Sequence, residues 1–194
     1  MIRIVGLSGS LRKGSYNTAL LNAAAGMMPG DAEIDVRSIR GIPLYDGDVE
    51  AAEGIPAPVA TLKDAVAAAA GLLLVTPEYN NSIPGVFKNA IDWLSRPPAD
   101  IKRVFGGKAV ALIGASPGAF GTILSQNAWL PVLRTLGAEL WTGQRLMVSR
   151  AGSVFDAQGN LADPKIAEQL RSYVQGFCAY VVTCAARPMP SGRP

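Results

Sequence analysis

The loop Ser8 to Asn17, SGSLRKGSYN, is the first stretch whose residue types could do chemistry, because it joins a short apolar run to a segment with helical spacing. Its serines offer hydroxyl donors, its glycines allow close backbone approach, and Arg12 can bind a phosphate through two hydrogen bonds. Backbone N–H groups at a helix start favour an anion as well. Ser15 stands where the Walker pattern requires Lys, and GxGxxG is absent, so one terminal phosphate fits best. The alternative is an ordinary polar turn.

Two further loops each follow an apolar run. The loop Thr76 to Gly85, TPEYNNSIPG, is fixed by two prolines, and Tyr79 can pack against a ring while Asn, Ser and peptide groups match the polar edge of a planar heterocycle such as a flavin. The alternative is a rigid turn with Tyr79 at a subunit interface. The loop Ala115 to Thr122 combines small residues with Phe120, and it would complete a shallow cleft.

Composition excludes several classes of function. Histidine is absent from all 194 residues, which removes Ser/His/Asp triads, Cys/His dyads, histidine-ligated zinc and histidine bases. Lys and Arg number 18 against 15 acids, a net charge of +3, and they are scattered, so small anions are expected as ligands rather than nucleic acid. Cys178 and Cys184 lie six apart, which fits neither a redox pair nor a zinc knuckle, so we expect reduced thiols and no metal.

The elements that must position these loops follow from hydrophobic periodicity. Apolar strands are predicted at Ile2 to Leu7, Glu33 to Ile39, Leu72 to Thr76, Ala109 to Ile113 and Glu139 to Val148. Helices are predicted at Asn17 to Met28 with Asn17 or Thr18 as cap, Val59 to Ala70, Val86 to Leu94, Ile123 to Leu136 with a kink at Pro131, and from Asp163-Pro164 onward. We expect one domain over residues 1 to 186 and a disordered tail over 187 to 194.

Apolar strands that alternate with helices indicate a parallel sheet covered on both faces. A flavodoxin-like order and a truncated dinucleotide-binding fold both suit this strand count, and both place ligands at the carboxyl ends of the strands. In the flavodoxin-like order the first and third strands are neighbours. The loops Ser8 to Tyr16 and Pro77 to Pro84 would then face each other.

Three motifs are jointly more specific than any single loop: GSLRKGSYN at Gly9 to Asn17, IPLYD at Ile42 to Asp46, and PEYNNSIPGVFKNAIDWLSR at Pro77 to Arg96. With them the chain resembles the NADPH-dependent FMN reductase family, near its bacterial quinone and chromate reductase branch, from roughly Ile4 to Val181. The resemblance implies an α/β flavodoxin-like three-layer sandwich with a five-stranded parallel sheet in the order 2-1-3-4-5.

The same resemblance implies FMN as cofactor and NADPH or NADH as co-substrate, with no catalytic side chain because FMN carries the chemistry. It implies that the FMN phosphate is held by Ser10, Arg12, Ser15 and Asn17, that the isoalloxazine is contacted by Pro77, Glu78, Tyr79 and Asn80, and that Ser116 is a further cofactor position. Together with the neighbouring polar and glycine positions of these loops, the candidate FMN-binding residues are Ser10, Arg12, Ser15, Tyr16, Asn17, Pro77, Glu78, Tyr79, Asn80, Ser82, Ser116 and Gly118.

The expected reaction is a ping-pong cycle in which NADPH passes hydride to FMN and two electrons then reach a quinone, with chromate, azo and nitro compounds as further candidates. The alternative is a non-enzymatic electron carrier of flavodoxin type, which the basic composition and Arg12 disfavour. The resemblance also implies a homodimer or a dimer of dimers. The longest apolar run, Ala65 to Val75, is about half a membrane span, and no targeting signal is visible, so we expect a cytoplasmic protein without membrane partners.

Overall fold

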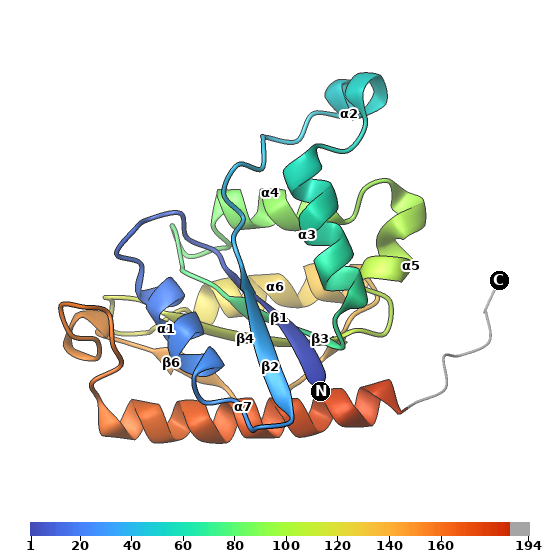
Figure 1. The fold of residues 1–194 in the computed structure, drawn as a ribbon. Helices are drawn as coiled ribbons and strands as arrows, with labels where there is room; N and C mark the ends of the chain where they lie inside the picture. The colour runs from blue at the N-terminus through green and yellow to red at the C-terminus, as the bar shows by residue number, and fades with distance from the viewer. Residues whose placement is uncertain (187–194) are drawn as a thin grey trace.

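The computed structural model describes residues 1–186, and its centre is a parallel β-sheet in the order β2-β1-β3-β4-β5, with β6 also paired to β4 (Figure 1). The predicted strand order is therefore confirmed. The predicted tail, residues 187–194, lies outside the described residues. The strands are β1 Ile2–Ser8, β2 Ala32–Arg37, β3 Gly71–Val75, β4 Ala109–Ala115, β5 Glu139–Leu140 and β6 Leu146–Val148.

The prediction of one last strand over Glu139 to Val148 is wrong. Leu140 pairs with Val110 and Leu146 pairs with Ile113, so residues 141–145 stand opposite Ala111 and Leu112 and strand pairing is interrupted. The Trp141 N–H still donates to the Val110 carbonyl at 2.8 Å, and its partly buried ring packs against Tyr173, with ring centroids 4.7 Å apart. Aromatic packing accompanies the break between β5 and β6.

Helices cover both faces of the sheet, as the alternation of strands and helices predicts. The helices are α1 Tyr16–Ala25, α2 Gly47–Glu53, α3 Ala57–Ala68, α4 Gly85–Leu94, α5 Ile101–Val104, α6 Ile123–Thr135 and α7 Pro164–Ala185. Leu72 and Leu74 of β3 pack with α3, α4 and α6, whereas Leu73 and Val75 pack with α1 and α7. This alternation along one strand defines the three layers.

Two helices are not predicted by the sequence analysis. Helix α2 buries none of its residues, so it has no apolar stripe for a periodicity argument to detect. Its start is fixed by Asp46, whose carboxylate accepts a hydrogen bond from the Asp48 N–H at 2.8 Å. Helix α5 spans a single turn, which is also too short for a periodic signal. Within the described part of the chain, no helix is both long and apolar enough to span a membrane.

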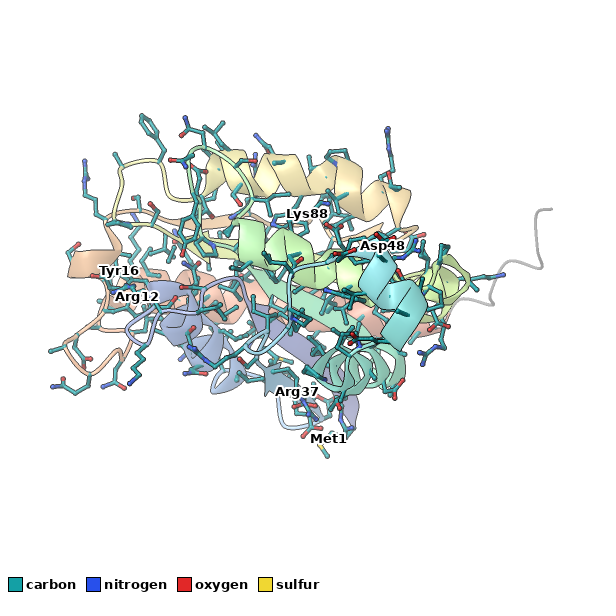
Figure 2. The ribbon with its side chains drawn as sticks, turned by 90° about the horizontal axis from the view of Figure 1, so that it is seen from above. Met1, Arg12, Tyr16, Arg37, Asp48 and Lys88 are labelled. Carbon is teal, nitrogen blue, oxygen red and sulfur yellow. The ribbon has the colours of Figure 1, made fainter. Side chains whose placement is uncertain are left out.

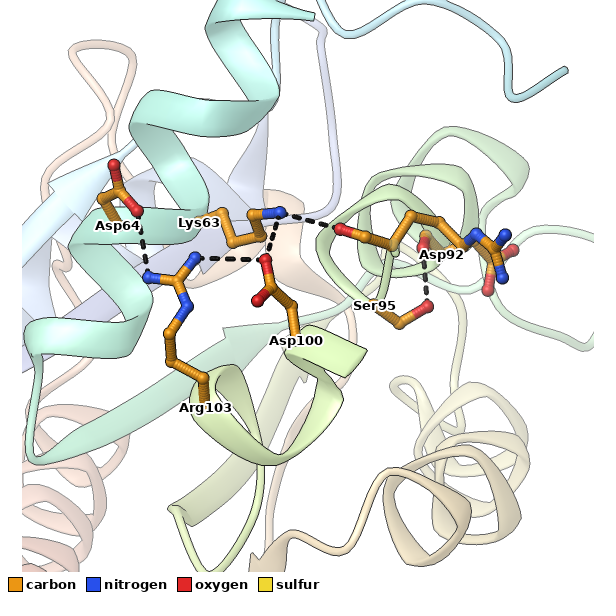
Figure 3. Close-up of polar contacts among 7 residues, drawn as sticks. Lys63, Asp64, Asp92, Ser95, Asp100 and Arg103 are labelled. Carbon is orange, nitrogen blue, oxygen red and sulfur yellow. Dashed lines mark hydrogen bonds and ion pairs between the residues drawn. The ribbon is translucent and has the colours of Figure 1, made fainter. Parts of the chain in front are cut away.

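An ion network ties α3 to α5 and to the end of α4 (Figure 3). The buried Lys63 Nζ donates to the Arg96 carbonyl at 2.7 Å and pairs with Asp100 Oδ2 at 2.8 Å. Arg103 bridges Asp100 and Asp64 at 3.3 and 3.1 Å. Hydrogen bonds from Lys63 and then Arg103 hold the pKa of Asp100 below its ordinary value of 3.8. The carboxylate form of Asp100 is therefore stabilised by folding.

Because this pKa is lower in the folded chain than in the unfolded one, the contribution of Asp100 to stability is complete above about pH 5 and falls away as the pH drops through 4 and below. We expect Asp100→Asn to lower the urea midpoint at pH 7 and to flatten its decline between pH 5 and pH 3. Glu53→Gln, which removes an exposed carboxylate from α2, serves as the control. Parallel declines of wild type and Asp100→Asn would contradict the assignment.

Candidate functional site

The three loops predicted to carry chemistry meet at the carboxyl ends of β1, β3 and β4, where they enclose a cleft of about 480 Å³. The predicted meeting of the loops after the first and third strands is thereby confirmed. Figure 2 labels Arg12 and Tyr16, which lie together beside the start of α1. The lining residues are Ser10, Arg12, Ser15, Tyr16, Asn17, Pro77, Glu78, Tyr79, Ala115, Ser116 and Pro117.

Three candidate residues, Asn80, Ser82 and Gly118, lie outside this lining. Asn80 and Ser82 belong to a tight turn in which the Tyr79 and Ser82 backbones exchange two hydrogen bonds, of 3.2 and 3.1 Å. Both central residues of the turn, Asn80 and Asn81, have positive φ, a conformation that Asn tolerates better than most residues. Their roles in cofactor binding, and that of Gly118, stay predictions.

Ser15 is the N-cap of α1, which corrects the expectation that Asn17 or Thr18 caps this helix. Its Oγ accepts hydrogen bonds from the N–H groups of Asn17 at 3.2 Å and Thr18 at 3.3 Å. Ser10 Oγ likewise accepts from the Arg12 N–H at 3.3 Å. Since a hydroxyl that accepts still has its own proton to donate, both serines can donate to an anion in the cleft.

Asn17 does not cap α1, because its side-chain amide is hydrogen-bonded to the end of β4. Its Nδ2 donates to the Ala115 carbonyl and its Oδ1 accepts from the Ala115 N–H, both at 2.8 Å. The side chain is buried. Asn17 thus joins the loop Ser8 to Asn17 to the end of β4. Nothing local in the sequence indicates this pairing, because the two residues are 98 positions apart.

Positive charge at the loop Ser8 to Asn17 comes from more than one segment of the chain. The Arg12 guanidinium is held over the Tyr16 ring, 5.5 Å from its centroid. Arg40, which follows β2, donates from Nη2 to the Leu11 carbonyl and so supports the loop from outside. Sequence reasoning missed Arg40 as a site residue, because only the parallel pairing of β1 with β2 brings it to the loop.

The residues present fit FMN. The hydroxyls of Ser10 and Ser15 and the Arg12 guanidinium could hold a phosphate, and Pro77, Tyr79 and Ser116 could pack against a planar ring. Tyr79 is 48% exposed, so the end of the cleft that it lines is open to solvent. The volume is also within the usual range for cofactor and ligand clefts.

The fold and the cleft together define a flavodoxin-like flavoprotein. Among solved structures, the chain is similar to FerB, a flavoenzyme NAD(P)H:(acceptor) oxidoreductase from Paracoccus denitrificans, with a TM-score of 0.84 and 32% identity over 94% of this chain and 98% of that one. Residues 2–152 match the NADPH-dependent FMN reductase family. The chain belongs to that family.

Curated relatives cover almost the whole chain. An NAD(P)H-dependent FMN reductase of Pseudomonas aeruginosa is 44% identical over 180 residues, 93% of this chain and 95% of the relative. A 2-hydroxy-1,4-benzoquinone reductase of a Burkholderia species is 38% identical over 180 residues, and a quinone reductase of Escherichia coli K12 is 36% identical over 182; each match covers 93% of this chain, with 96% and 95% of the respective relatives. The predicted enzyme class, the FMN cofactor and the NAD(P)H co-substrate are thereby confirmed.

Proposed function

We propose that this chain is an FMN-dependent NAD(P)H:quinone oxidoreductase. The observation that carries the proposal is the cleft in which an anion-binding end and a planar-ligand end lie side by side at the carboxyl ends of β1, β3 and β4. The names of two relatives, a 2-hydroxy-1,4-benzoquinone reductase and a quinone reductase, support a quinone as acceptor. Chromate, azo and nitro compounds are proposed as further acceptors on the ground that the ring end is open.

The chemistry that bound FMN supplies is two-electron transfer between a nicotinamide and an acceptor. The part of the chain itself is to bind the cofactor and to orient the reactants. Ser10, Ser15 and Arg12 would hold the phosphate, and Pro77 and Tyr79 would pack against the ring. Because the chain has no histidine, no imidazole takes part in proton transfer, and we assign to the chain the positioning of the reactants.

We propose that NADPH and the quinone occupy the ring end of the cleft in turn, because both are planar and both need the exposed face of the same ring. Double-reciprocal plots of initial rate against NADPH concentration, at several fixed quinone concentrations, are then expected to be parallel. Lines that intersect would indicate a complex holding both substrates and would contradict the shared cleft.

The direct test of the function is an anaerobic titration of the purified FMN-loaded protein with NADPH, followed by its absorbance spectrum. We expect about one equivalent of NADPH to bleach the flavin bands and added benzoquinone to restore them. A protein that binds FMN but stays oxidised in excess NADPH, and is reduced only by one-electron reductants, would instead be a carrier of flavodoxin type.

We also propose that the enzyme is a cytoplasmic homodimer or a pair of dimers. Large apolar side chains are exposed on several elements, including Leu44 and Phe120, each 82% exposed, and Leu124 and Leu130 of α6. A subunit interface requires a contiguous apolar surface rather than single exposed side chains, so the proposal requires that some of these residues lie together on the face that a second subunit covers.

A further inference from the structure

Helix α6 receives its N-terminal cap from a distant loop. The first N–H groups of a helix have no partner within the helix, and the N-cap residue Thr122 provides no side-chain hydrogen bond to them. Thr122 Oγ1 instead accepts from Gln126 Nε2 at 3.1 Å. Glu78, 46 residues before Leu124, supplies the missing acceptor. Its Oε2 accepts from the N–H groups of Leu124 at 2.8 Å and Ser125 at 3.0 Å.

This contact is favourable for two reasons. A carboxylate at a helix N-terminus interacts with the positive end of the helix dipole, and hydrogen bonds to a charged acceptor are stronger than those between neutral groups. The same segment has a second connection to α6, since Thr76 Oγ1 and Ser125 Oγ lie 2.8 Å apart and are fully buried. Residues 76 and 78 therefore both form hydrogen bonds to the first turn of α6.

These hydrogen bonds matter for the cleft because the two segments that they join also line the two sides of the cleft. Pro77, Glu78 and Tyr79 line one side, and Ser116 and Pro117 line the other, in the loop that leads into α6. The hydrogen bonds that hold the start of α6 against residue 78 therefore also set the separation of these two sides. The family resemblance implies that Glu78 contacts the isoalloxazine, but its carboxylate already accepts hydrogen bonds from Leu124 and Ser125.

We propose that Glu78 is a positioning residue, whose carboxylate acts as an acceptor for the first turn of α6 and thereby holds the two sides of the cleft at the separation that the FMN ring requires. This inference rests on the proposed use of the cleft for FMN. It assigns to Glu78 neither a proton transfer nor a charge that FMN needs.

Two substitutions separate this role from a direct contact. Glu78→Gln keeps a side-chain oxygen that can accept the two N–H groups, whereas Glu78→Ala removes it. We expect Glu78→Ala to weaken FMN binding to the apoprotein roughly tenfold, the size of effect that loss of a helix cap gives, and Glu78→Gln, which keeps the acceptor oxygen but loses the charge, to weaken it less. Glu53→Ala, which removes an exposed carboxylate from α2, is the matched control.

Hydrogen exchange of the apoprotein gives a readout that does not depend on FMN. In Glu78→Ala the amides of Leu124 and Ser125 are expected to exchange faster, while that of Val66, buried in α3, is unchanged. Unchanged exchange at Leu124 and Ser125, or loss of FMN from Glu78→Gln as severe as from Glu78→Ala, would overturn the inference. A wild-type apoprotein that binds no FMN would overturn the proposed function, whatever the exchange rates.

Discussion

Replacing Gly114 by Ala is expected to lower the melting temperature by roughly 6 to 12 °C. A Cβ built at Gly114 would lie 2.2 Å from the Thr76 carbonyl oxygen and 2.2 Å from Thr122 Oγ1. The first of these atoms belongs to the backbone, and Thr122 is fully buried, so neither can move cheaply. Overpacking of this kind costs about 3 kcal/mol, and each kcal/mol lowers the midpoint of a chain of this size by about 2 to 4 °C.

The same substitution should weaken FMN binding, because Gly114 precedes Ala115, which lines the cleft and binds Asn17. Displacing the end of β4 from Thr76 would separate the loops after β3 and β4. Gly30→Ala is the control, since a Cβ there meets nothing within 4 Å. Calorimetry and FMN titration of both variants measure the two effects. A Gly114→Ala protein as stable as Gly30→Ala would show that the end of β4 is not closely packed.

The fold could be predicted from the sequence where local patterns and packing agree. Leu72 to Val75 form a continuous apolar run because β3 is buried on both faces, and such a run reads as a central parallel strand. The break between β5 and β6 could not be predicted, because it depends on where Trp141 finds its aromatic partners. Helix α2 was missed because none of its residues is buried, so no apolar periodicity marks it in the sequence.

Part of the candidate site can likewise be predicted from the sequence, and part of it cannot. The loops were found because parallel strands deliver their carboxyl ends to one edge of the sheet, so composition and strand order suffice to bring them together. The contacts that fix the loops are long-range and leave no local signal. Asn17 reaches Ala115, Arg40 reaches Leu11 and Glu78 reaches α6. Sequence therefore predicts which loops form the site, and the fold decides which side chains remain free for a ligand.

Among the residues that line the cleft, Arg12 carries the positive charge, so we expect it to contribute strongly to FMN affinity. Its guanidinium lies over the Tyr16 ring at the phosphate end of the cleft. Losing a hydrogen bond between charged groups costs about 1.5 to 3 kcal/mol, so we expect Arg12→Ala to weaken FMN binding roughly tenfold to more than a hundredfold. Quenching of flavin fluorescence by the apoprotein measures this affinity. Arg134→Ala, which makes the same change of charge on an exposed turn of α6, should bind FMN like wild type.

Riboflavin, which has the same ring system without the phosphate, locates the effect of Arg12 within the ligand. If Arg12 binds the phosphate, wild type and Arg12→Ala should bind riboflavin with nearly equal affinity, and the difference between the proteins should be confined to FMN. If Arg12→Ala weakens riboflavin and FMN equally, the guanidinium acts through the Tyr16 ring on the shape of the cleft instead. Arg12→Lys refines the assignment, because a lysine keeps the charge but loses the two-pronged geometry, and an intermediate affinity is expected.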